Sequence, residues 1–155
     1  MSDQTPLDRL AALGLTLPAA PAPAANYVPF VQVGSLLHVS GQISNGADGL
    51  VTGKLGADLD VAAGAQAAQL CALSLLAQAQ AACGGDLSGI KRLVKLVGFV
   101  NSTPDFTDQP KVINGASDLM VAVLGDAGRH ARSAVSAPSL PFGVAVEIEA
   151  IFELV

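Results

Sequence analysis

The clearest alternation of apolar and polar positions lies at the end of the chain, in Ala145–Leu154. Every second residue there is apolar, and this period of two is typical of a β-strand with one buried face. The apolar face comprises Val146, Ile148, Ala150, Phe152 and Leu154. The other face carries the three glutamates of the chain, Glu147, Glu149 and Glu153, with Ile151 among them. The pattern therefore predicts a strand that buries one side and presents carboxylates on the other.

Three segments have the composition and the end signals of helices. A short helix over Pro6–Leu13 has a threonine N-cap and a proline at its first position. A long helix over Val61–Ala82, capped by Asp58 or Asp60, is rich in alanine and leucine and contains no charged residue. We expect its glutamine side to meet solvent or a partner. A third helix over Pro110–Leu124 ends at a glycine.

Short apolar runs bounded by turn-forming residues predict the remaining strands. They are Tyr27–Val33, Leu36–Ser40, Leu50–Thr52, Leu93–Val100 and Ser133–Ser136. After the first helix, the elements follow the order β-β-(β)-α-β-α-β-β. This order predicts a single α+β domain in which two helices pack on one face of one sheet.

The N-terminal region has a different composition from the rest. A proline-alanine connector begins at Leu17 and has no pattern for burial, so we expect it to be extended and to lie over the surface. The sequence thus divides into an N-terminal arm, residues 1–25, and a domain, residues 26–155.

Composition adds a prediction about assembly and argues against one class of partner. Of the 155 residues, 51% are hydrophobic and only 14% are charged, which is a low charged fraction for an isolated monomer and indicates a buried subunit interface. The net charge of −5 argues against nucleic-acid binding, because a phosphate-binding surface needs clustered lysine and arginine.

The sequence also predicts the cellular compartment. We find no apolar run close to the roughly 20 residues that span a bilayer, and the N-terminus lacks a signal-peptide pattern. Cys71 and Cys83, on one helix, would lie about 18 Å apart, which is too far for a disulfide. These features predict a reduced, cytoplasmic protein without membrane contact.

One stretch, Arg132–Glu149, contains the candidate chemistry. An arginine enters a short strand, a Leu140-Pro141 turn follows, and the chain returns through the strand that carries the glutamates. A guanidinium and a carboxylate brought together in this way form an anion-binding and proton-handling pocket in one interpretation. In the other, which the residues alone favour, they form an ion pair between neighbouring strands.

Two motifs resemble those of a known family. The C-terminal motif consists of Arg132-Ser133, Val135, Leu140-Pro141 and Val146-Glu147-Ile148-Glu149. The second is Val39-Ser40-Gly41-Gln42-Ile43, which follows Gly34. Together they resemble the RidA family, also called the YjgF/YER057c/UK114 or L-PSP endoribonuclease family, over about residues 27 to 155.

This resemblance implies a fold, an assembly and an activity. The implied fold is a chorismate-mutase-like α+β domain with a mixed sheet, in a homotrimer whose sheets line a barrel-like space and whose pockets lie at the subunit interfaces. The implied activity is hydrolysis of reactive enamines and imines, such as 2-aminoacrylate, to 2-keto acids and ammonia, without a cofactor or metal. The alternatives are a non-catalytic module that binds a small carboxylate ligand, and an endoribonuclease or translation inhibitor.

The resemblance also assigns roles to residues. Arg132 falls on the family's arginine, which grips the substrate carboxylate in a planar two-pronged contact. Glu147 falls on the glutamate that positions water, and Tyr27 falls on the pocket tyrosine. Two further candidates for substrate contact come from their positions in the chain: Ser133 follows the arginine, and Asn114 lies on an inner turn of the helix Pro110–Leu124.

The remaining candidates have structural interpretations, and the sequence departs from the family in three places. His38 is expected to be structural, within a buried strand, and His130 to be a loop residue. Ala134 stands where the family usually has a cysteine, so thiol chemistry at the site is not expected. The segment Pro110–Arg129 is longer than is usual, and the N-terminal arm is extra, which together indicate a divergent subgroup.

Overall fold

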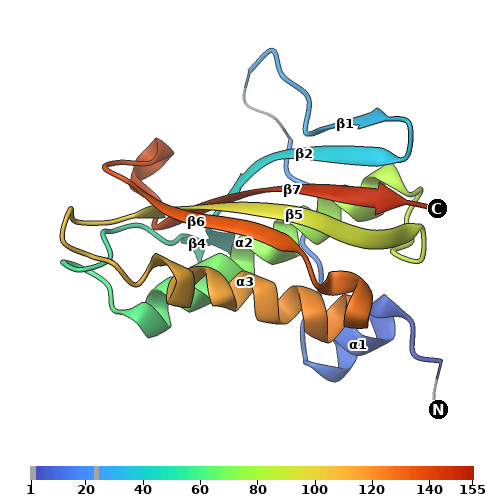
Figure 1. Cartoon of the computed structure of the whole chain (residues 1–155), viewed down its shortest axis with the longest axis horizontal. Helices are drawn as coiled ribbons and strands as arrows, with labels where there is room; N and C mark the ends of the chain where they lie inside the picture. The colour runs from blue at the N-terminus through green and yellow to red at the C-terminus, as the bar shows by residue number, and fades with distance from the viewer. Residues whose placement is uncertain (1–2, 23–24) are drawn as a thin grey trace.

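The structure is a computed structural model that describes residues 3–22 and 25–155. Its centre is a five-stranded sheet with the strand order β1-β2-β7-β5-β6 (Figure 1). The strands are β1 (Phe30–Val33), β2 (Leu36–Ile43), β5 (Ile90–Asn101), β6 (Ala131–Ala137) and β7 (Val146–Leu154). Only β5 and β6 run parallel to each other, so the sheet is mixed. The C-terminal strand β7 lies at its centre.

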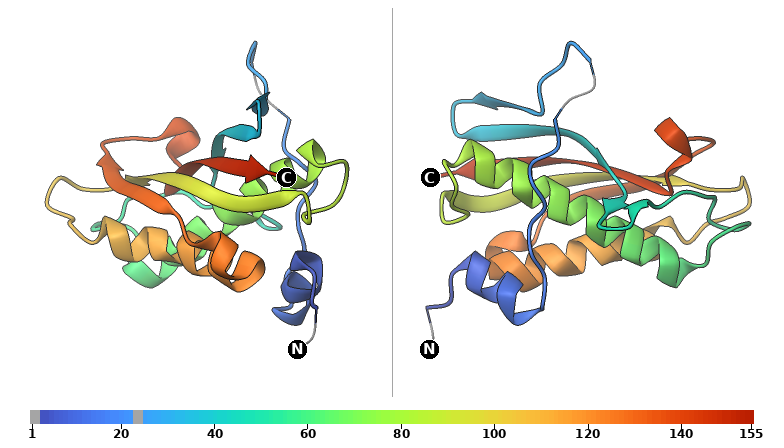
Figure 2. Two further views of the ribbon diagram at one scale, coloured as in Figure 1. Left: turned by 45° about the vertical axis from the view of Figure 1, so that its right-hand side comes forward. Right: turned by 180° about the vertical axis from the view of Figure 1, so that it is seen from behind.

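Two helices cover one face of this sheet. They are α2 (Val61–Ala82) and α3 (Gln109–Leu124), and the short helix α1 (Pro6–Ala12) packs against α3 (Figures 1 and 2). Two short 3-10 turns, η1 (Gly125–Gly128) and η2 (Pro141–Gly143), precede β6 and β7. The expected α+β layer of two helices on one sheet is confirmed, with α1 as a third helix.

Helix α2 forms the middle of the core. Asp60 caps it by accepting a hydrogen bond from the backbone N–H of Ala63 at 2.8 Å. Among the described residues α2 alone is long and apolar enough to cross a membrane, but it lies buried against the sheet, as a core helix does. Burial also explains why it carries no charge. The expected exposure of its glutamines is wrong for Gln78, which is 1% exposed.

The predicted segments differ from the observed strands mainly at their ends. The first strand begins at Phe30 and not at Tyr27, because only residues 30 to 33 pair with β2. Strand β2 extends three residues beyond Ser40, through a register shift that lies between Val39 and Gln42. The expected turn after β2 is a small hairpin, β3 (Asn45–Gly46) and β4 (Gly49–Leu50). Thr52 makes only an isolated bridge, to Val144.

The face of the sheet that the helices leave open carries both apolar and charged side chains. Cross-strand pairs share a face, and the pairs Val31–His38, Val33–Leu36 and Leu36–Glu153 place several large apolar residues on this open face. Val33 is 65% exposed. The interpretation of His38 as a residue within a buried strand is wrong, since its side chain is exposed on this open face. An apolar open face is what a subunit interface requires.

The described part of the arm is attached to the domain at two points. Leu10 of α1 is 2% exposed within the main core, and the Arg9 guanidinium donates from Nη1 to the Val123 carbonyl at 3.1 Å. Further along, Gln78 Nε2 of α2 donates to the carbonyl of Pro21 at 2.7 Å. The connector between these points is extended, as predicted, and crosses the surface next to α2 (Figure 2).

Candidate functional site

Glu147 lies on the open face of the central strand. Its neighbours Val146 and Ile148 are fully buried beneath the sheet, so the alternation of the strand turns Glu147 the other way. Its carboxylate lies over Gly41 of β2. A methyl group placed on Gly41 would overlap Glu147 Oε1, so only glycine leaves the carboxylate room there.

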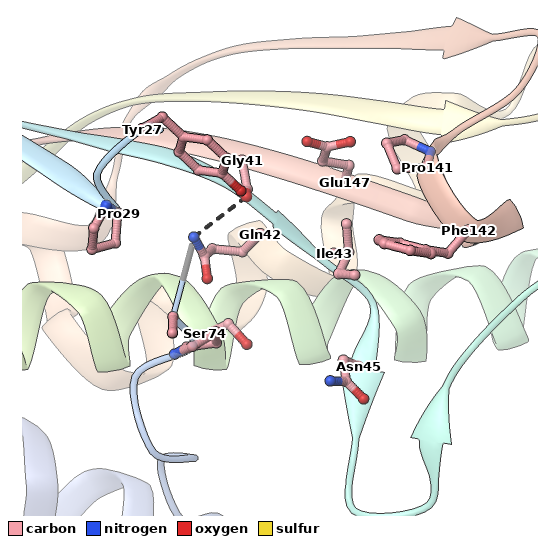
Figure 3. Close-up of a pocket in the computed structure, with 12 residues that line it drawn as sticks. Tyr27, Pro29, Gly41, Gln42, Ile43, Asn45, Ser74, Pro141, Phe142 and Glu147 are labelled. Atoms are coloured by element: carbon pink, nitrogen blue, oxygen red, sulfur yellow. Dashed lines mark hydrogen bonds between the residues drawn. The ribbon is translucent and has the colours of Figure 1, made fainter. Parts of the chain in front are cut away.

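A cavity of about 310 Å³ surrounds this carboxylate. Figure 3 shows Glu147, Tyr27 and Phe142 around it, with Ser74 of α2 on the far side of β2. On the side of β2 away from β7, the pairing with β1 ends at Phe30–Val39, and the cavity reaches past the edge of β2 beyond this point. The structure thus brings together two of the predicted site residues, Glu147 and Tyr27.

The environment of Glu147 favours its protonated form. Burial raises the pKa of the Glu147 carboxyl above its ordinary value of 4.5, and the charge of Glu149 on the same face raises it further. A carboxylate with a raised pKa is a better proton acceptor than an exposed one, which suits a residue that takes a proton from water.

Arg132 extends from β6 toward α3. Its Nη1 donates to Asn114 Oδ1 at 2.8 Å and to Ser117 Oγ at 3.1 Å. Among the described residues, Arg132 makes no ion pair and donates no hydrogen bond from Nε or Nη2. The interpretation of Arg132 as an ion-pair partner of the glutamates is therefore wrong within one chain. The guanidinium is anchored by one nitrogen, and the edge formed by the other two is available for an anion.

Ser117 connects Arg132 to a histidine that sequence reasoning had treated as a loop residue. His130 lies with Nδ1 2.6 Å from the Gly128 carbonyl and Nε2 2.9 Å from Ser117 Oγ. A carbonyl only accepts, so Nδ1 carries a proton, and in the tautomer with the proton on Nδ1 alone the ring accepts at Nε2 from the Ser117 hydroxyl. The Ser117 oxygen is then oriented to accept from Arg132. Sequence spacing gave one signal for this cluster, because Asn114 and Ser117 are three residues apart and share a helix face.

The predicted turn does not bring Arg132 and Glu147 together within one chain. Arg132 pairs across the sheet with Leu96, which pairs with Ala150, and both of these are buried on the helix side. Glu147 is on the open side, so the sheet separates the two groups. Ser133 follows Arg132 in the strand and therefore faces the open side, away from the arginine and Asn114.

Ala134, which stands where the family usually has a cysteine, packs against the core. Ala134 faces the helices, is half-buried against the core and pairs with Gly98 of β5. As for metal binding, the described residues contain no group of three His, Cys, Asp or Glu side chains close enough to hold an ion.

Comparison with known proteins identifies the family. Residues 7–154 match the family model described as "YjgF/chorismate mutase-like, putative endoribonuclease". The chain belongs to this family. The YjgF-like chain is 56% identical to protein TCP17 of Trypanosoma cruzi over 144 residues, which cover 92% of this chain and 89% of that protein.

Two solved structures show different degrees of similarity. The crystal structure of Atu1372, a protein of unknown function from Agrobacterium tumefaciens, is 54% identical with a TM-score of 0.91, covering 97% of this chain and 92% of that one. The structure of Escherichia coli TdcF with bound serine is 26% identical with a TM-score of 0.62, covering 88% of this chain and 94% of that one. The resemblance to the RidA family and the chorismate-mutase-like fold are thereby confirmed.

Proposed function

We propose that this YjgF-like chain hydrolyses reactive enamines and imines of the 2-aminoacrylate type to 2-keto acids and ammonia. The observation that carries the proposal is the state of Arg132, which is anchored through Nη1 and has Nε and Nη2 directed to no group of the described chain. Such a guanidinium is prepared to bind a carboxylate in two parallel hydrogen bonds. Enamines and imines derived from amino acids carry that carboxylate.

Glu147 supplies the second requirement of the reaction. With its raised pKa, the carboxylate takes a proton from a water molecule as the oxygen attacks the C=N carbon. Nitrogen takes up this first proton, which gives a neutral carbinolamine. The proton of its hydroxyl group then moves to nitrogen as well, the C–N bond breaks, the carbonyl forms and ammonia leaves. Tyr27 lies in the same cavity, and its ring would cover the bound substrate.

A complete site requires two copies of the chain. Because the sheet separates Arg132 from Glu147 in one copy, we infer that the edge strand β6 of one subunit faces the Glu147 cavity of the next. Such a head-to-tail contact closes into a ring of three when each copy is rotated by a third of a turn relative to the next. A homotrimer is the ring that the family resemblance implies, and the apolar open face supports a buried interface.

Mixing two inactive variants tests this proposal. Arg132→Ala and Glu147→Gln should each be inactive in an ammonia-release assay on freshly generated 2-aminoacrylate. Co-refolding equal amounts of both should restore about a quarter of wild-type activity, since about three quarters of random trimers are mixed and each regains one of three sites. Sedimentation equilibrium should give three times the chain mass of 15.5 kDa. No restored activity in a proven mixed trimer would refute the two-chain site.

A second candidate is a non-catalytic binding module that retains the carboxylate grip. The serine bound in the TdcF structure favours it, because serine is a small ligand with a carboxylate. Calorimetry with 2-keto acids, combined with the ammonia assay, separates the two functions. Binding without ammonia release supports the module.

The family description also raises an endoribonuclease, which we rank last. The net charge of −5 and the eight scattered basic residues provide no surface that follows an RNA backbone.

Cys71 and Cys83 are free thiols, which fits the reducing cytoplasm that we propose as the location.

A further inference from the structure

A second cavity adjoins the one around Glu147. It has a volume of about 570 Å³ and lies between the arm, α2 and the β3–β4 hairpin. We call it the arm groove. Pro21 from the arm, Asn45 from β3 and Ser74 from α2 line both cavities, so the two spaces meet at these residues. Figure 3 shows Ser74 and Asn45 at this junction, across β2 from Glu147.

The walls of the arm groove select an uncharged occupant. Leu15, Leu17 and Pro18 line it from the arm, and Leu70 and Leu73 line it from α2, while no ionisable side chain takes part. The few polar side chains include Ser74 and Asn45 at the junction. A chain of methylene or methyl groups suits such a surface, whereas a charged group would lose its hydration without gaining a partner.

The arm is fixed at the point where the cavities meet. The carbonyl of Pro21 accepts a 2.7 Å hydrogen bond from Gln78 Nε2, and Gln78 is 1% exposed. The same Nε2 lies 3.5 Å from Gln42 Oε1, and Gln42 follows Gly41, over which the Glu147 carboxylate lies. The arm segment at Pro21 therefore forms a wall of the groove that is held by residues next to the candidate site. This wall is ordered without a bound ligand.

We propose that the arm groove binds the side chain of the substrate, and that the substrate is an enamine or imine of a 2-amino acid with an extended apolar side chain. This inference rests on the proposed function. The carboxylate and the C=N carbon would lie between Arg132 of one subunit and Glu147 of the next. The side chain would then pass the free edge of β2 into the groove. Each cavity alone reaches the range of roughly 300–1,000 Å³ that holds drug-sized ligands, which far exceeds what 2-aminoacrylate fills.

Calorimetry with a series of stable 2-keto acids tests the inference on the full-length protein. From 2-oxobutyrate through 2-oxohexanoate to 2-oxooctanoate, affinity should rise roughly two- to fourfold for each added methylene that leaves water. Ala19 lines the groove from the arm and Ala47 from the β3–β4 hairpin, and both are exposed. Ala19→Phe or Ala47→Phe should fill it and abolish the gain for long chains, while the affinity for 2-oxobutyrate stays unchanged.

Ala20→Phe is the matched control, because Ala20 is exposed on the same extended segment and does not line the groove. It should bind the whole series as the wild type does. Affinity that is independent of chain length, or a gain that survives in Ala19→Phe and Ala47→Phe, overturns the groove assignment. The proposed function fails separately, if Arg132→Ala binds 2-oxobutyrate as tightly as the wild type.

Discussion

Gly41 lies directly under the carboxylate of Glu147, in the part of β2 where the register with β7 shifts. A methyl group at this position would overlap Glu147 Oε1. We expect Gly41→Ala to displace the carboxylate and to lower the rate of ammonia release at least tenfold, since small misplacements of catalytic groups have large effects.

A double-mutant cycle provides the control for Gly41→Ala. In a Glu147→Ala background the added methyl group has no carboxylate to meet, so the change in melting temperature caused by Gly41→Ala should be much smaller there. Equal effects in both backgrounds would show that Gly41 is needed for the backbone of β2 and not for the placement of Glu147.

The raised pKa of Glu147 makes a prediction about stability and pH. Between the ordinary value of 4.5 and the raised pKa, the folded chain keeps a proton that the unfolded chain has released. The free energy of unfolding therefore falls as pH rises through this window, and the loss is complete above the raised pKa. Glu147→Gln has no carboxyl group to titrate here, so this loss of stability is absent from the variant. Its melting temperature should therefore be higher than that of the wild type near pH 8 and equal to it near pH 4.

Thermal melts of both proteins across this pH range measure the effect. If the wild type melted higher than Glu147→Gln near neutral pH, a cation of another subunit would have to stabilise the carboxylate, and the raised pKa would not hold in the assembly.

Arg132 is expected to matter for ligand binding and not for folding. Arg132→Ala should weaken 2-keto acid binding roughly 10- to 150-fold, the value of a charged hydrogen bond of about 1.5–3 kcal/mol. Arg132→Lys should also be severely impaired, because an ammonium cannot reproduce the two-pronged contact. Since Arg132 makes no ion pair in the described chain, the melting temperature should stay near that of the wild type. Clear destabilisation with unchanged affinity would refute the assignment.

Ser117 and His130 are expected to orient Arg132 without contacting the substrate. Ser117→Ala removes an acceptor from Arg132 Nη1, and His130→Leu removes the acceptor that fixes the Ser117 hydroxyl. Both should raise KM several-fold with little change in kcat, the result expected when ground-state and transition-state binding weaken equally. Ser117→Thr and His130→Gln keep the hydroxyl and an acceptor, so they should restore KM. A fall in kcat alone would contradict this role.

Much of the fold was predictable because its signals are local. The alternation after Ala145 identified β7 and its two faces, and the uncharged run at residues 61–82 identified α2 with its correct bounds. The ends of β2 were not predictable, since the register shift near Gly41 depends on pairing with a strand a hundred residues away. The prediction that the glutamines of α2 meet solvent or a partner failed at Gln78 for a similar reason, because its contacts are with Pro21 of the arm and Gln42 of β2, both distant in the sequence.

The candidate site was predictable in its residues and not in its geometry. The two motifs identified Arg132 and Glu147, but a strand pattern does not reveal that a five-stranded sheet separates the two side chains. His130 is a loop residue, as predicted, but its hydrogen bond to Ser117 could not be predicted because nothing in its local sequence indicates that contact. Both features concern contacts between separate elements of the chain.

The central position of β7 has a consequence for how the protein is made. Strand β7 is synthesised after the other four strands of the sheet, yet it joins β2 on one side to β5 on the other. Until it emerges, the nascent chain holds two separate halves of a sheet, and the halves cannot merge. The sheet therefore cannot be completed until β7 has emerged, and such long-range pairing is slow. A chain that terminates early, near residue 140, would lack both the strand that unites its sheet and the glutamate on which its chemistry depends.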